Sequence, residues 1–118
     1  MGYKKDSVIV KRAFTFAIAV IQLTKGLPNT YENIIFVKQI IRSATSIGAN
    51  IEEALGANSK KEFVHCMNIA KKEARESKYW LRLIHEMNSE INLNILLQEC
   101  EEIINMLTSI VKTASRNL

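Results

Sequence analysis

The fold of this chain is decided by one stretch, residues 42–84, which reads RSATSIGANIEEALGANSKKEFVHCMNIAKKEARESKYWLRLI. It holds two amphipathic segments that meet at Gly56. Glycine directly after a helical pattern is typical of a helix C-terminus. Ser59 and Glu62 then form an S-x-x-E capping box, a helix-start signal that contributes about 1 kcal/mol. The stretch is therefore predicted to be a helical hairpin.

Apolar residues recur every three or four positions in the flanking sequence as well, which predicts four helices in all. The first is expected to end at Gly26-Leu27-Pro28, and Asn29 with Glu32 is expected to cap the second. Because short connections between long helices favour antiparallel neighbours, we predict an all-α, up-down-up-down antiparallel four-helix bundle. It occupies residues 6–118 after a tail of residues 1–5, with helices at about residues 7–24, 30–55, 60–87 and 92–116.

Three of the helices carry one apolar stripe each, predicted to face the core. In the second helix the stripe is Val37, Ile40, Ala44, Ile47, Ile51 and Ala54. In the third it is Phe63, Met67, Ala70, Ala74, Ser77, Leu81 and Ile84. In the fourth it is Leu93, Leu97, Cys100, Ile104, Leu107, Val111 and Ala114.

The first helix is more apolar than a single core-facing stripe requires. One stripe comprises Ile9, Ala13, Phe16, Val20 and Leu23, and a second comprises Val10, Phe14, Ala17, Ile18 and Ile21. Arg12, Thr15, Ala19 and Gln22 are left to face water. Soluble monomers rarely expose an apolar patch of this size, so we expect self-association through Val10, Phe14, Ile18 and Ile21. The alternative is that both stripes of the first helix are buried in the core of a monomer.

Composition places the chain among globular helical proteins. Its 118 residues fit one domain, 47% of them are apolar, and there are four glycines and one proline. The apolar run of residues 13–21 is too short to cross a membrane, and the opening residues do not form a secretory signal. We therefore expect a cytoplasmic protein with no membrane partner, in which Cys66 and Cys100 are free thiols.

The net charge of +4 is distributed unevenly. Residues 1–84 carry 14 Lys and Arg against 7 Asp and Glu, whereas residues 85–118 carry 2 against 5. Lys71, Arg75, Lys78 and Arg82 form one line on the third helix at i, i+4, i+7 and i+11, beside Tyr79. The line is a candidate surface for nucleic acid, although most charged helix faces are merely solvated.

Catalytic and metal signals are weak. A di-iron bundle needs two Glu-x-x-His motifs, and only Glu62 with His65 has that spacing, since Arg82 precedes His85. No histidine can be assigned as a partner of Cys66 for nucleophilic chemistry. We therefore expect no enzyme activity, metal or cofactor.

A polar stripe on each helix of the hairpin suggests a structural network. Arg42, Asn50 and Glu53 lie on the second helix, with Ser46 between them, and Glu73 and Glu76 lie on the third. Paired carboxylates can perform general acid–base catalysis. Ion pairs and hydrogen bonds that fix the register of the two helices are the favoured interpretation, because carboxylates near a core need partners.

The same region resembles a known family. The resemblance rests on Arg42-Ser43, Ser46-Ile47, Asn50-Ile51, Glu53-Ala54, the run from Ser59 to Phe63, the run from Lys72 to Glu76, and Tyr79 to Leu83. These residues resemble the four-helix-bundle proteins encoded by intervening sequences in bacterial large-subunit ribosomal RNA genes. They also resemble the accessory variability determinants of diversity-generating retroelements. The resemblance implies a homopentameric barrel and, through the retroelement relatives, a link to a reverse transcriptase and RNA.

The sequence thus favours a non-enzymatic, homo-oligomeric bundle that binds structured RNA or DNA through basic helix faces. A protein–protein adaptor, for instance a partner of a reverse transcriptase, is the alternative. The two differ in their response to salt, because binding to a polyanion weakens steeply as salt is raised.

Overall fold

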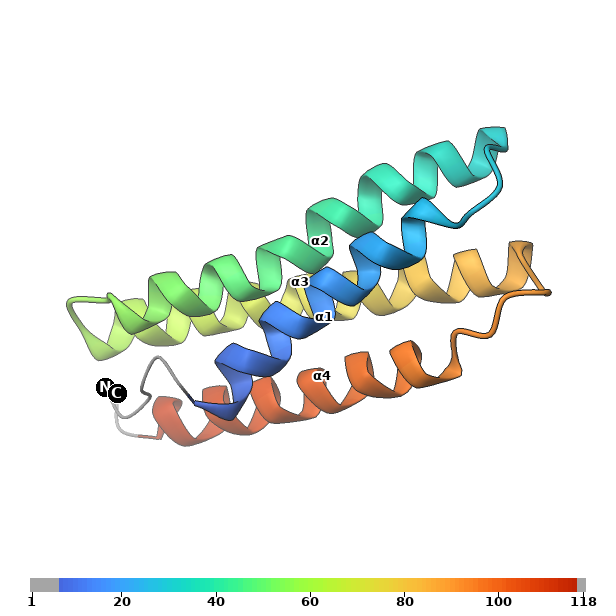
Figure 1. Ribbon diagram of the computed structural model, residues 1–118. Helices are drawn as coiled ribbons and strands as arrows, with labels where there is room; N and C mark the ends of the chain where they lie inside the picture. The colour runs from blue at the N-terminus through green and yellow to red at the C-terminus, as the bar shows by residue number, and fades with distance from the viewer. Residues whose placement is uncertain (1–6, 117–118) are drawn as a thin grey trace.

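The computed structural model describes residues 7–116, which form four helices and no strand. Their bounds are α1 Val8–Lys25, α2 Tyr31–Leu55, α3 Lys60–Met87 and α4 Asn94–Ser115. Each helix runs opposite to the one before it (Figure 1). The predicted helices are therefore confirmed to within two residues at each end. The predicted tail of residues 1–5 lies outside the described residues.

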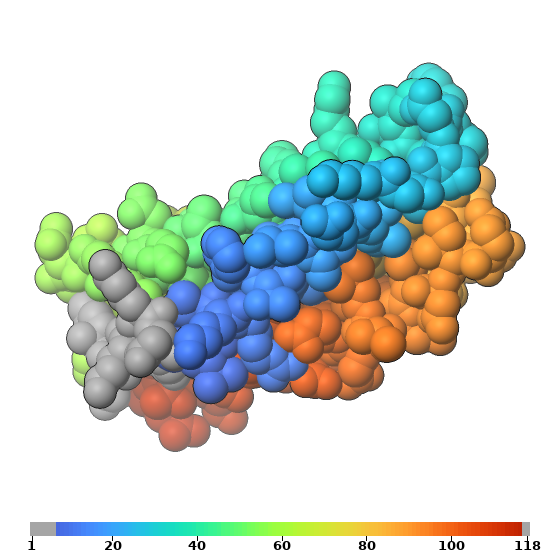
Figure 2. Space-filling model, viewed as in Figure 1, coloured from blue at the N-terminus to red at the C-terminus, as the bar shows by residue number. Residues whose placement is uncertain are grey.

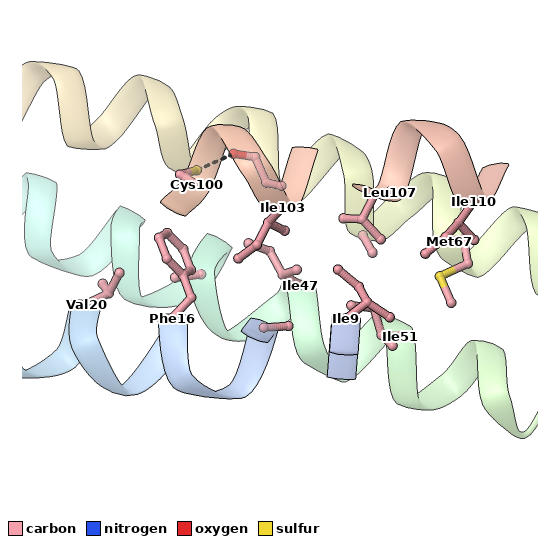
Figure 3. Close-up of a cluster of buried hydrophobic side chains, with 14 of the residues drawn as sticks. Ile9, Phe16, Val20, Ile47, Ile51, Met67, Cys100, Ile103, Leu107 and Ile110 are labelled. Atoms are coloured by element: carbon pink, nitrogen blue, oxygen red, sulfur yellow. Dashed lines mark hydrogen bonds between the residues drawn. The ribbon is translucent and has the colours of Figure 1, made fainter. Parts of the chain in front are cut away.

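The helices form an elongated bundle of 46 × 21 × 20 Å. Each helix packs against the next one in sequence, and α1 closes the bundle against α4. The contact between α2 and α3 is the most extensive, and that between α1 and α4 the least. Side chains from all four helices meet along the axis (Figure 3), among them Ile9, Phe16, Ile47, Met67, Ile103 and Leu107.

Capping explains where α2 and α3 begin. The Ser59 hydroxyl accepts a hydrogen bond from the backbone N–H of Glu62 at 3.1 Å, as the capping box predicts. The Glu62 carboxylate accepts from the N–H of Asn58 at 3.3 Å. The expected cap of α2 was wrong by one residue. Thr30, not Asn29, holds the cap position and accepts from the N–H of Asn33 at 3.1 Å.

The buried face of α4 differs from the predicted stripe. Ile103 and Ile110 are buried, whereas Leu97, Ile104 and Ala114 are only partly buried. Ile103 and Ile104 are adjacent, so a spacing of three or four residues from Cys100 is satisfied by either. Packing against the other helices selects Ile103, and Ile104 is left beside α3 at the surface.

Helix α1 has one buried face and one exposed apolar face. Ile9, Ala13, Phe16 and Val20 are buried as predicted. Phe14 is 68% exposed, and Ile18 is also exposed. Figure 2 shows α1 lying across the surface between α2 and α4. No helix within residues 7–116 is long and apolar enough to span a membrane.

Arg12 does not face water as expected. Its guanidinium donates to both carboxylate oxygens of Glu99 at 2.8 Å and to Glu102 at 2.5 Å, so it joins α1 to α4. These contacts with Arg12, together with a hydrogen bond from Gln98, lower the pKa of Glu102. This contact could not be predicted from the sequence, because Glu99 and Glu102 lie 87 and 90 residues from Arg12.

Candidate nucleic-acid interface

Three of the four predicted basic residues line one groove. The groove lies between α3 and α4, has a volume of about 290 Å³, and is lined by Arg75, Lys78, Tyr79, Arg82, Glu101 and Ile104. Helical periodicity explains the grouping, because Arg75, Lys78 and Arg82 stand at i, i+3 and i+7, which lie on one face. Lys71 is partly buried and does not line the groove.

The cations of the groove differ in their partners. The Lys78 ammonium lies 2.7 Å from a carboxylate oxygen of Glu101, an ion pair that crosses from α3 to α4. Arg75 and Arg82 are exposed, and neither forms an ion pair with any residue from 7 to 116. The two arginines are therefore the charges in this groove that are available to an anion. Counting Arg75, Lys78 and Arg82 against Glu101, the lining carries a net charge of +2.

Tyr79 adds an aromatic ring to the groove. Its side chain is 53% exposed. Its ring centroid lies 5.3 Å from that of Trp80, in a T-shaped arrangement with an interplanar angle of 70°. The ring of Trp80 in turn lies 6.4 Å from that of Phe36 on α2. An exposed ring thus lies among cations and packs against the partly buried Trp80.

The predicted polar network is present in part. Arg42 on α2 donates to Glu73 at 3.1 Å and also to Glu76. The indole N–H of Trp80 donates to the same Glu76 oxygen at 2.9 Å. This hydrogen bond, followed by the contact with Arg42, lowers the pKa of Glu76, although burial opposes the effect. Both carboxylates are therefore occupied by partners within the bundle.

The other two predicted members do not join this network. Asn50 donates to the carbonyl of Ser46 in its own helix at 2.9 Å. Glu53 is exposed, and its side chain forms no hydrogen bond or ion pair with another residue between 7 and 116. Arg42 is itself 48% exposed, so the network lies at the surface of the α2–α3 contact, outside the core.

Two buried polar pairs were not predicted. Asn33 and Asn88 exchange side-chain amide hydrogen bonds at 2.9 Å in both directions. The Ser77 hydroxyl donates to that of Ser43 at 2.8 Å in the middle of the α2–α3 contact. Asn33, Asn88 and both serines are buried. Single polar residues inside apolar stripes were the signal that was available in the sequence.

A second surface feature lies between α1 and α2. Phe14, Ile18 and Ile21 border a groove of about 470 Å³ that also includes the small residues Ala17, Gly48 and Ala49. Val10 and Ile21 are partly buried. The four residues expected at a subunit contact therefore lie on one side of α1, and Phe14 and Ile18 are its most exposed members.

The side chains that were considered for metal binding or thiol chemistry are Glu62, Cys66 and Cys100. Glu62 is used in the cap of α3, and within residues 7–116 no three His, Cys, Asp or Glu side chains gather as a metal site would require. Cys66 and Cys100 are free thiols, as expected. Burial raises the pKa of Cys100 to about 12, and its thiol donates to the carbonyl of Ala74 at 3.3 Å (Figure 3).

The fold and the side-chain arrangement define a four-helix-bundle protein with a basic groove on one side and an apolar face on another. Residues 5–109 match the model of the 23S rRNA-intervening sequence protein family, so the chain belongs to that family. It is similar to a crystal structure described as a protein of unknown function from the S23 ribosomal protein family of Bacteroides thetaiotaomicron. The two share 39% identity with a TM-score of 0.81, over 89% of this chain and 99% of the other. No curated protein matches the chain.

Proposed function

We propose that this chain is a non-enzymatic, self-associating bundle that binds nucleic acid through the groove between α3 and α4. The observation that carries the proposal is the lining of that groove, in which Arg75 and Arg82 flank the exposed Tyr79. Arginine presents several donors in a plane that suits phosphate oxygens, and it also stacks on bases. Neither arginine is neutralised by a carboxylate of residues 7–116, so both are free to contact phosphates.

Self-association supports this function through repetition. The exposed side chains of Phe14 and Ile18 lie beside the apolar groove between α1 and α2, a surface that a second copy can cover. The family resemblance implies a barrel of five copies. An assembly repeats the basic groove once per subunit, so contacts that are weak singly add up by multivalency.

Nucleic-acid binding is tested by reversing the two free charges. Arg75→Glu with Arg82→Glu is expected to abolish binding of a labelled RNA or DNA in fluorescence anisotropy. Binding by the parent should fall with salt, and each arginine that contacts a phosphate contributes roughly 0.7–0.9 to the slope of log affinity against log salt. The matched control is Lys25→Glu with Lys61→Glu, which makes the same change in net charge at exposed positions outside the groove.

The outcome separates the two candidate functions. Loss of binding in the groove variant alone supports the nucleic-acid function. Equal loss in the control variant would show that net charge, not the groove, governs binding. Binding that survives the reversal, or no binding at low salt, contradicts the proposal and favours the alternative of a protein–protein adaptor, for instance for a reverse transcriptase.

Self-association is tested by Phe14→Glu, which places a charge on the exposed apolar face. Light scattering of the parent should give a mass well above 13.4 kDa, about 67 kDa for five copies. The variant should dissociate or lose solubility, whereas Gln22→Glu on the same helix should leave the mass unchanged. A parent protein that remains at 13.4 kDa at all concentrations contradicts the proposal.

A further inference from the structure

We propose that the α3–α4 groove selects unpaired nucleotides, with one base stacked on Tyr79 and the neighbouring phosphates held by Arg75 and Arg82. This inference rests on the proposed function, and it names the form of nucleic acid that the groove accepts. In a duplex the faces of the bases are covered by their neighbours, so only a single strand, loop or bulge offers a free base to an aromatic ring.

The positions of the three residues fit this arrangement. They follow one another at i, i+4 and i+7, which spans about 10 Å along a helix at a rise of 1.5 Å per residue. One arginine therefore lies about one turn to each side of the ring. Arg75, Tyr79 and Arg82 all line the same groove, so a base on the ring has a cation on either side.

The ring of Tyr79 is held in place before any ligand arrives. Trp80 contacts it in the T-shaped arrangement, and the Trp80 indole is fixed by its hydrogen bond to Glu76. Glu76 is bound in turn to Arg42 on α2. This series of contacts links the ring to the most extensive helix pair of the bundle. A preorganised aromatic side chain loses little conformational entropy when it binds.

Glu101 limits what else the groove can hold. Its carboxylate pairs with Lys78 on the lining and repels a phosphate that enters deeply. The same carboxylate can accept a hydrogen bond from the exocyclic amino group of a base. The groove volume of about 290 Å³ is at the lower end for ligand pockets, which suits a single nucleotide. Lining charge and size thus both favour a base inside the groove and phosphates at its rim.

The test compares one sequence in two forms. A labelled 12-nucleotide single strand and the same strand annealed to its complement are titrated with the full-length protein, as RNA and as DNA. The single strand is expected to bind at least tenfold more tightly than the duplex. Tyr79→Ala should weaken single-strand binding by about 5- to 100-fold, and Tyr79→Phe by less than about twofold, because stacking needs the ring and not the hydroxyl.

Tyr31→Ala is the matched control, since Tyr31 is an exposed tyrosine on α2 that does not line the groove. The single tryptophan, Trp80, gives a second readout. A base stacked on the adjacent Tyr79 should change Trp80 fluorescence in the parent, and a duplex should not. Circular dichroism and light scattering show whether each variant keeps its helices and its oligomer size.

Each result decides a different point. Equal binding of duplex and single strand, or a Tyr79→Ala variant that binds like the parent, overturns the selection of unpaired bases. If nucleic-acid binding is nevertheless lost in Arg75→Glu with Arg82→Glu, the proposed function stands, but the preference for unpaired bases does not. If neither form binds, both proposals fall. Tight binding of single-stranded RNA but not of single-stranded DNA would identify RNA as the ligand, through contacts to its 2′-hydroxyl groups.

Discussion

Replacing Asn88 with alanine is expected to lower the free energy of unfolding by about 2–4 kcal/mol. Asn33 is 2% exposed and Asn88 is 3% exposed. The change removes both bonds of the reciprocal pair and the bond from Asn88 to the carbonyl of Ile84. Asn33 keeps its bond to the carbonyl of Pro28, but its own carbonyl oxygen loses its partner. The three lost bonds, at about 0.5–1.5 kcal/mol each, give the expected range, which already includes the stranded buried acceptor, worth about 1–3 kcal/mol on its own.

Urea unfolding followed by circular dichroism at fixed protein concentration measures this loss by linear extrapolation. Asn50→Ala is the control, because Asn50 is partly buried and bonds only within its own helix. We expect that change to alter stability by less than about 1 kcal/mol, since alanine has the higher helix propensity.

A double replacement tests the cause of the loss. With leucine at both Asn33 and Asn88 no side-chain amide is stranded, so the part of the loss that comes from the unpaired Asn33 oxygen should return, whereas the carbonyls of Pro28 and Ile84 still lose their side-chain donors. The reasoning is refuted if Asn88→Ala unfolds within about 0.5 kcal/mol of the parent, or if the double leucine variant is no more stable than Asn88→Ala.

Three further changes test the α1–α2 and α2–α3 contacts. Gly48→Ala should raise the unfolding free energy by about 0.5–1 kcal/mol, because the added methyl meets only the Cβ of Ala13 at 3.8 Å. A lower unfolding free energy in the urea assay would contradict this. Arg42→Met should cost no more than about 1 kcal/mol, since Arg42 is half exposed; a loss of 3 kcal/mol in the same assay would show a stranded carboxylate. The pKa of Glu76 is lowered in the folded state, so its contribution should be complete above the ordinary value of 4.5 and be lost as the pH falls below it. Trp80→Phe removes the hydrogen bond to Glu76, so the unfolding free energy of this variant should fall less between pH 6 and pH 3 than that of the parent. The same pH dependence in both proteins would contradict this prediction.

The positions of the helices could be predicted from the sequence because the signals are local. Ser59 and Glu62 lie three residues apart, and the buried residues of α3 keep a spacing of three or four positions from Phe63 to Ile84. The line of basic residues on α3 was predictable for the same reason. Which of these residues line a groove was not, because that depends on how α4 lies beside α3 and on the pairing of Lys78 with Glu101.

The features that the sequence did not reveal join residues far apart in the chain. Asn33 and Asn88 are separated by 55 positions, and Arg12 and Glu99 by 87. A single sequence shows that each residue is polar but does not identify its partner. The prediction that Asn50 joins the network of Arg42 was wrong for another reason. Asn50 shares a stripe with Arg42, but its short side chain bonds to the carbonyl of Ser46 one turn earlier.

The unequal packing of the helices implies an order in which the molecule comes apart. Helices α2 and α3 share the largest contact and are joined by only residues 56–59, so this hairpin holds together through local interactions. Helix α1 meets α4 least, and its exposed side carries Phe14 and Ile18. Backbone amides of α1 should therefore exchange with deuterium through partial openings that leave the hairpin intact. A neighbouring subunit bound to α1 would prevent these partial openings, so the amide exchange rate of α1 reports on assembly.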